Sequence, residues 1–165
     1  MSNSKILTTP FILILLSIIL GCEDNSTFVR NSFTCEIDGE VFTPKNDDWK
    51  GDPAIEGTIE GGTLIITGRN NVNGSSSVGI KILNFSDPGT YILNDADENY
   101  GRYYSSEIMS QCFTNADYTG TLIIESYEAK EEIVWGKFNF EATTSNGSKV
   151  VAVTQGQFII DCAVL

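Results

Sequence analysis

The sequence predicts an all-β fold, an antiparallel β-sandwich or flattened barrel of about eight to ten strands behind an N-terminal lipoprotein signal peptide. No stretch after residue 22 keeps a helical spacing of apolar residues. Short segments instead alternate apolar and polar side chains, as strands do when one face is in the core and one is in water. Turn signals rich in Gly, Asn, Asp and Pro separate these segments at close intervals.

The first predicted element is a β-hairpin over residues 33–44. Apolar and polar residues alternate from Phe33 to Ile37, and Asp38-Gly39 is a strong signal for a two-residue turn. Pro44 ends the hairpin because proline has no N–H group to donate to a neighbouring strand.

The middle of the chain predicts several short strands rich in β-branched residues, with turns between them. They cover residues 55–59, 63–67, 77–83, 90–93 and 102–105. Residues 107–118 show no clear period, so no element is predicted there.

The last part of the chain shows the most regular alternation of apolar and polar residues. The expected segments are strands over residues 119–127 and 133–142, then a closing hairpin of residues 149–154 and 157–163 around Gln155-Gly156. One face of the segment 133–142 is expected in the core, and it carries Val134, Gly136, Phe138, Phe140 and Ala142. Trp135 has the opposite parity, so it is predicted to point away from the core.

An apolar run over residues 6–20 ends in Gly21-Cys22, which has the form of a lipoprotein cleavage site. The run is shorter than the about 20 residues of a membrane-spanning helix, and Lys5 supplies the positive charge before it. Cleavage before Cys22 would make this residue the new N-terminus and the site of lipidation. Two acyl chains hold a protein stably, so the bilayer is the expected partner of acylated Cys22. The alternative is an uncleaved anchor in which Cys22 stands by chance.

These signals divide the chain into three parts. Residues 1–21 are the predicted signal peptide, residues 22–31 a lipidated tether, and residues 32–165 a single β domain. The acidic run at residues 23–26 resembles the signal that sends lipoproteins of Bacteroidetes-type bacteria to the outer leaflet. The predicted location is therefore the bacterial outer membrane, by a lipid anchor, with surface exposure as one option and a periplasmic face as the other.

Charge and composition exclude several classes of function. The chain has 22 acidic and 10 basic residues and a formal net charge of −12, which disfavours a nucleic-acid partner. It contains no histidine, so Ser-His-Asp and Cys-His catalysis and His-ligated zinc are excluded. We expect no cofactor and no enzymatic activity.

Cysteines other than Cys22 allow one disulfide with one thiol left over. Strand parity places Cys35 and Cys162 on core-facing positions of the first and last strands, which makes them the candidate pair. The alternatives are a pairing that involves Cys112, or small buried thiols that stay free.

Several of these segments together resemble a family of small Bacteroidetes-type lipoproteins of unknown function. The similar segments are residues 33–44, 120–142 and 150–160, the last with Thr154, Gly156 and Phe158 in a Thr-x-Gly-x-Phe pattern. Residues 94–118 match the family poorly. The resemblance implies a lipid-anchored β domain, and it implies no catalytic residues because the similar motifs are turns and core strands.

An acidic loop offers a weak candidate site for calcium. Asp95, Asp97 and Asn99 present oxygen atoms at alternate positions, which hard cations prefer. The spacing differs from that of the helix–loop–helix calcium site, and no helices flank it. A solvated acidic loop without metal is the simpler interpretation, so no metal site is predicted.

Aromatic side chains suggest a ligand-facing surface. Trp49, Trp135, Tyr103 and Tyr104 are the candidates, because an aromatic ring can lie against the face of a sugar while Asp and Asn at the rim accept its hydroxyls. Rings that cover sheet edges or pack under loops are the alternative.

Two hypotheses for function follow. The first is a membrane-anchored binding or structural module of the cell envelope, with a glycan or an envelope protein as its partner. The second is a carboxylate-based hydrolase that acts on glycans, which would need two acids across a cleft.

Overall fold

The computed structural model describes residues 31–45, 53–72, 74–96 and 98–162, and this part of the chain is built of strands without a helix. The strands are β1 (Ser32–Ile37), β2 (Glu40–Phe42), β3 (Ile55–Glu60), β4 (Thr63–Asn70), β5 (Ser76–Ile82), β6 (Gly89–Leu93), β7 (Tyr100–Ser105), β8 (Ser110–Phe113), β9 (Gly120–Glu128), β10 (Ile133–Thr144) and β11 (Val150–Asp161). The all-β prediction is confirmed. The residues for which no element was predicted supply β8, which has only four residues and therefore too little alternation to be recognised.

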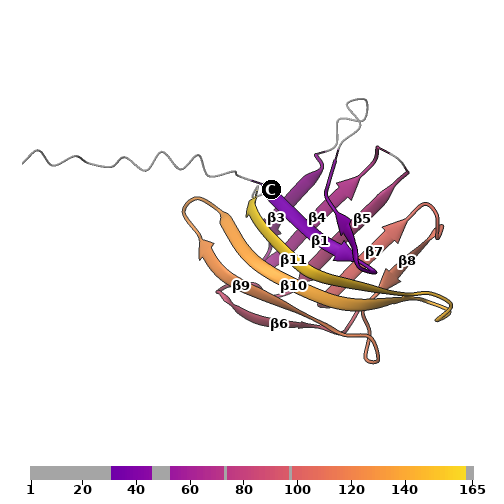
Figure 1. The fold of residues 1–165 in the computed structure, drawn as a ribbon. Helices are drawn as coiled ribbons and strands as arrows, with labels where there is room; N and C mark the ends of the chain where they lie inside the picture. Colours follow the sequence, from indigo (N-terminus) through magenta and orange to yellow (C-terminus); the bar gives the residue numbers. More distant parts are fainter. Residues whose placement is uncertain (1–30, 46–52, 73, 97, 163–165) are drawn as a thin grey trace, which may run out of the picture.

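All of these strands belong to one antiparallel sheet that is bent into two layers. Figure 1 shows the layers crossing, with β6, β9, β10 and β11 in one and β3, β4, β5, β7 and β8 in the other. We call them the long-strand layer, which also includes β1 and β2, and the short-strand layer.

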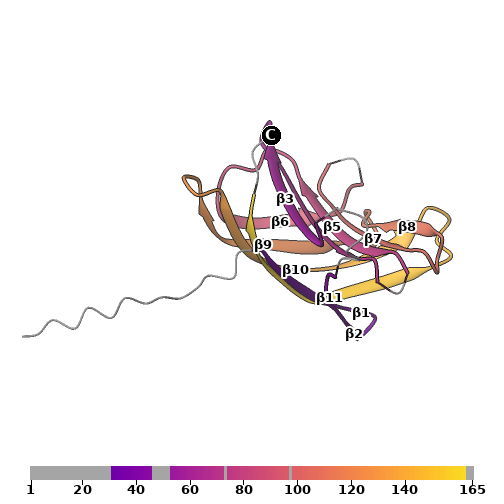
Figure 2. The ribbon, with the colours of Figure 1, turned by 90° about the horizontal axis from the view of Figure 1, so that it is seen from above.

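Strand β10 joins the two layers. From Ile133 to Phe140 it pairs with β9, whereas Thr143 and Thr144 at its end pair with β8. The view from above shows β8 beside the far ends of β10 and β11, where the sheet turns over (Figure 2).

The sheet is not closed into a barrel. The strand order ends at β3, which pairs with β4 alone. The segment after β2 is held to the short-strand layer by a parallel bridge, in which the Lys45 N–H donates to the Arg69 carbonyl at 2.9 Å. The Asn71 N–H donates to the Lys45 carbonyl at 3.0 Å.

The hydrophobic core lies between the layers. Alternation along β10 buries Val134, Gly136, Phe138, Phe140 and Ala142, as predicted, and leaves the intervening side chains outside. The short-strand layer contributes a matching set of fully buried aliphatic residues, namely Leu64, Ile66, Val78, Ile80 and Ile82. Each fully buried side chain of this size contributes about 1.5–3 kcal/mol relative to its exposed state.

Gly101 lets the layers approach closely. A Cβ atom on Gly101 of β7 would stand 2.5 Å from Cδ1 of Phe140 on β10, so the Phe140 ring lies against bare backbone. The glycine is therefore a requirement of packing between layers, since it does not have a positive φ.

The predicted closing hairpin is wrong. Residues 150–161 form one continuous strand, and Gln155 is a bulge with a φ of 51°. The register against β10 shifts there, with Gly156 opposite Phe138 and Val153 opposite Phe140. Strands β1 and β10 pair with β11 both before and after the bulge. A reversal of the chain at this point would break the backbone hydrogen bonds of both pairings.

The turn predicted at Asp38-Gly39 is confirmed. Asp38 and Gly39 have φ values of 52° and 88°, which is the left-handed backbone that a tight hairpin turn requires. Residues 1–30, with the predicted signal peptide and Cys22, lie outside the described residues, as does Trp49. Among the residues that are described, no helix has the length and hydrophobicity needed to cross a bilayer.

Candidate functional site

The candidate disulfide is not formed. Cys35, Cys112 and Cys162 are free and buried in the described part of the chain. The ladder pairs Thr34 with Gln157 and Glu36 with Thr154, so Cys35 lies beside the bulge of β11. At about 3.3 Å per residue, the stretch from there to Cys162 spans about 20 Å, far beyond the about 7 Å between Cα atoms that a disulfide allows. Parity places both residues in the core, but Cys162 lies just beyond the end of β11, far along the strand from the position beside Cys35.

Burial makes these thiols poor nucleophiles. Desolvation raises the pKa of Cys35 to about 12. For Cys162, burial and the nearby Asp161 and Glu132 carboxylates raise the pKa to about 12 as well, and burial also raises that of Cys112. A thiolate is the reactive form, so the three residues fit a packing role better than a chemical one.

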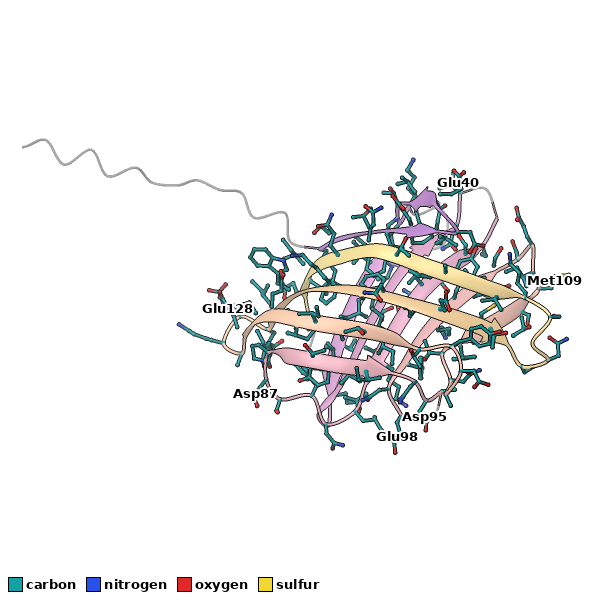
Figure 3. All side chains as sticks on the ribbon, turned by 60° about the horizontal axis from the view of Figure 1, so that its bottom comes forward. Glu40, Asp87, Asp95, Glu98, Met109 and Glu128 are labelled. Atoms are coloured by element: carbon teal, nitrogen blue, oxygen red, sulfur yellow. The ribbon has the colours of Figure 1, made fainter. Side chains whose placement is uncertain are left out.

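The candidate calcium loop uses its asparagine, Asn99, for structure. The side-chain oxygen of Asn99 accepts a hydrogen bond from the Leu83 N–H at 2.8 Å, and its carbonyl accepts from the N–H groups of Asn94 and Asp95, both at 3.1 Å. Asp97 lies outside the described residues. Within the described ranges no group of three or more acidic or cysteine side chains is arranged to hold a metal ion. Asp95 and Glu98 lie at a rim of the molecule (Figure 3).

Tyr103 and Tyr104 lie on opposite faces of the short-strand layer. Tyr103 pairs with Val78 and Cys112, both fully buried, so it packs against the core. Burial raises its pKa. Tyr104 pairs with Ser77 and Gln111 and points outward. Neighbours in an extended strand always diverge in this way, so the two rings cannot form one platform.

Trp135 lies on the outer face of the other layer. It pairs with Ile159 and Ser126, and 44% of its surface is exposed. A shallow groove of about 330 Å³ runs beside it, lined by Ser32, Phe33, Thr34, Trp135, Gln157, Phe158 and Ile159. Trp135 and Tyr104 lie on the outer faces of different layers. The candidate aromatic residues within the described ranges therefore do not converge on one site.

The outer face of the short-strand layer brings together charged and aromatic side chains that are distant in sequence. Register places them outward because their neighbours Gly101, Tyr103, Val78 and Ile80 point into the core. We call this surface the Arg102 face and define it by Arg69, Lys81, Tyr100, Arg102, Tyr104 and Phe113.

Arg102 is at the centre of this face. It pairs with Gly79 on one side and Phe113 on the other. Its Nη2, Nε and Cζ atoms lie 3.3, 3.4 and 3.7 Å from the point where a Cβ on Gly79 would stand, so the guanidinium group lies flat over the backbone. Its Nε atom is buried, and no described residue accepts a hydrogen bond from it, an arrangement that proteins usually avoid.

Aromatic rings and a second cation adjoin Arg102. The rings of Tyr100 and Phe113 meet edge to face, with centroids 5.4 Å apart and planes at 83°. The ammonium group of Lys81 lies 5.6 Å from the Tyr100 centroid, a cation–π distance. Arg69 at the other side of the face pairs with Glu56, Nη1 to Oε2 at 2.7 Å.

Grooves border the face on two sides. One of about 190 Å³ is lined by Arg69, Asn71, Ser75, Ser76, Ser77 and Tyr104. A larger one of about 640 Å³ begins at Gln111 and Phe113 and extends to the turn after β10. Much of its polar lining is used by the protein itself, since the Asn115 Oδ1 accepts from the N–H groups of Asp117 and Tyr118, both at 2.9 Å.

Sequence reasoning missed Arg102, Lys81 and Phe113. A usable signal was present, because Gly79 inside a strand often marks the close approach of another group. The pairing of Gly79 with Arg102 depends on which strands are neighbours, and β6 lies between them in sequence but not in the layer.

A comparison with protein families bears on this arrangement. The model of a domain of unknown function, DUF6252, matches residues 24–160. The chain belongs to the DUF6252 family. The DUF6252 match begins two residues after Cys22 and reaches into β11, so it includes the whole Arg102 face. The predicted resemblance to a family of unknown function is confirmed, whereas the Bacteroidetes-type source stays a prediction. Searches among curated proteins and solved structures gave no match to this DUF6252 chain.

Proposed function

We propose that this DUF6252 protein is a lipid-anchored binding module of the bacterial cell envelope. Acylated Cys22 holds it at the outer membrane, and the Arg102 face takes the ligand. The single observation that carries the anchoring is the cleavage site at Gly21-Cys22, directly ahead of the matched domain. The first strand begins at Ser32, so the tether from Cys22 reaches at most about 35 Å.

The binding role is supported by an arginine whose buried Nε atom finds no acceptor among the described residues. A half-buried guanidinium group with such an atom is costly to a fold that needs it only for packing. The cost is understandable if the charge serves a ligand. A glycan or an envelope protein is the partner class that suits a domain held at a cell surface.

The hydrolase alternative lacks an observation of its own. Glycoside hydrolysis needs two carboxyl groups that face each other across a cleft. In the groove of about 640 Å³ beside Phe113, the only acidic side chain among the described lining residues is that of Asp117, which is exposed.

Detergent partition of the full-length protein tests the anchor. We expect the wild-type protein in the detergent phase with a mass that includes diacylglyceryl and acyl groups, and the variant Cys22→Ser without the mass of these groups. Cys35→Ser is the matched control, because it removes a buried thiol and leaves the lipidation site intact. Wild-type protein in the aqueous phase, with its leader cut elsewhere, would contradict the proposal.

Protease treatment of intact cells tests the side of the membrane. If the acidic run at residues 23–26 directs export to the outer leaflet, added protease degrades the protein without lysis. Degradation only after the outer membrane is opened would place the domain in the periplasm and leave the anchor unaffected.

A further inference from the structure

Three basic residues lie on one face of an acidic protein. Strands β4, β5, β7 and β8 contain Arg69, Lys81 and Arg102 and neither Asp nor Glu, whereas the edge strand β3 of the same layer contains Glu60 and Glu56, which pairs with Arg69. The whole chain, in contrast, has 22 acidic and 10 basic residues. Several of the acids, Asp87, Glu98 and Glu128 among them, lie at the rims of the molecule (Figure 3). Because Arg69 is already paired with Glu56, the positive charge at the centre of the Arg102 face is that of Arg102 and the adjoining Lys81, inside a negative field.

Arg102 makes this surface specific for a particular kind of anion. The guanidinium group is planar, and it presents parallel N–H donors that match the two oxygens of a carboxylate. Packing over Gly79 fixes the orientation of that plane. No hydrogen bond or ion pair joins this side chain to another described residue, and the side chain is partly exposed, so its outer donors can receive an incoming carboxylate.

The rings around Arg102 fit the non-polar face of a sugar. Tyr100 and Phe113 lie on one side of Arg102, and Tyr104 on the other. The groove of about 190 Å³ beside Tyr104 is lined by Ser75, Ser76 and Ser77. The Ser75 hydroxyl already donates to the Asn71 Oδ1 at 3.3 Å, which leaves Ser76 and Ser77 to bond the hydroxyls of a single sugar ring.

We propose that the Arg102 face binds acidic saccharides, with Arg102 receiving the carboxylate of a uronic acid and the Tyr104 groove holding the adjacent sugar. This inference names the ligand of the proposed binding module and rests on that part of the proposed function. An anionic bilayer is a poorer partner, because the net charge of −12 repels it as a whole. A short oligosaccharide is small enough to interact mainly with the positive charge at the centre of the Arg102 face.

Titration calorimetry with hexagalacturonate, on the full-length protein in detergent micelles, is the test. We expect binding that weakens with salt, and no binding of the methyl-esterified hexamer, which has the same sugar rings without the charge. Arg102→Gln is expected to lower the affinity about tenfold, since it removes a charge-assisted pair. Lys137→Gln is the matched control on the other layer, where Lys137 pairs with Glu125, and it should leave the affinity unchanged.

If Arg102→Gln folds poorly, the changes in NMR chemical shift of the backbone amides of the wild-type protein test the inference instead. In the wild-type protein, hexagalacturonate should shift the amides of Tyr104 and Gln111 and leave the Trp135 indole signal in place.

Three results would overturn the inference. The first is that neither hexagalacturonate nor an alginate hexamer, a second uronic-acid oligosaccharide, binds the protein. The second is that the wild type and a folded Arg102→Gln variant bind hexagalacturonate equally well. The third is that Arg102-dependent binding is seen only with phosphatidylglycerol vesicles. Each of them leaves the detergent-partition result unchanged, so failure of the ligand assignment is distinguishable from failure of the anchor.

Discussion

Single residues in this protein owe their roles to which side of a strand they occupy. Parity along residues 133–142 correctly predicts that Trp135 is outside and that Phe138 and Phe140 are buried. The same rule separates Tyr103 from Tyr104, although residue type alone makes both of them candidates for one ligand-facing surface. Composition identifies aromatic side chains as candidates, but only the face that each one occupies decides whether they can act together.

The buried thiols predict a loss of stability at alkaline pH. The thiols of Cys35 and Cys162 have a folded-state pKa of about 12, above the ordinary 9.0 of the unfolded chain. Between these values the unfolded state loses a proton that the native state keeps. The free energy of unfolding therefore falls by up to about 1.4 kcal/mol per pH unit for each thiol, and the full stability is retained below pH 9.

Urea unfolding with reductant, compared between about pH 8 and pH 10.5, checks this expectation. The double variant Cys35→Ala/Cys162→Ala should show a shallower fall than the wild type. Parallel curves for the two proteins would mean that the thiols do not govern the alkaline transition.

Single elements were predicted best where local chemistry decides their ends. The hairpin β1–β2 follows from Asp38-Gly39, because left-handed backbone is needed there. The side chain of Asp38 adds long-range contacts that the sequence does not reveal. Its Oδ1 accepts from the Ala152 N–H at 2.9 Å, and its Oδ2 lies 3.4 Å from the Lys149 ammonium group.

Replacement of Asp38 by Ala should destabilise the domain by about 2 kcal/mol. Alanine is strained at a φ of 52°, and the Ala152 N–H loses its acceptor. Asp38→Asn is the matched control, because asparagine tolerates this backbone and keeps an oxygen for Ala152. It loses only the exposed pair with Lys149, worth about 0–1 kcal/mol. Chemical denaturation of both variants measures the difference, and equal losses would refute this account of the turn.

Strand β11 shows where local chemistry misleads. Gln155-Gly156 resembles the turn of a hairpin, and Gln155 does adopt a positive φ. Pairing with β1 and β10 on both sides keeps the strand continuous, and the turn becomes a bulge. A sequence signal for left-handed backbone is the same for a turn and for a bulge, so the choice depends on the neighbouring strands.

The whole molecule depends on the fit between its two layers. Gly101 in the short-strand layer accepts the ring of Phe140 from the long-strand layer, and Phe140 is only 3% exposed. Packing in such an interior leaves no room for an added methyl group. The bent sheet therefore requires a glycine at one strand crossing, for a reason that no local pattern reveals.

Gly101→Ala is expected to lower the free energy of unfolding by about 1–3 kcal/mol, because the new methyl group would overlap the Phe140 ring. Gly89→Ala on strand β6 is the matched control, since a Cβ there meets nothing within 4 Å. It should be neutral or stabilising by up to about 1 kcal/mol. Thermal unfolding distinguishes the two variants, and equal melting temperatures would contradict the role of Gly101 in layer packing.

The β class, most strand positions, the first turn and the core face of β10 could be predicted from the sequence, because they follow from alternation and turn chemistry within a few residues. It also carries the proposed lipidation site at Cys22 and the membership of the DUF6252 family. Tertiary structure alone decided the bend into two layers, the separation of Cys35 from Cys162 and the assembly of the Arg102 face. These depend on which strands pair and in what register, and pairing across long sequence separations is set by the total burial of the folded domain.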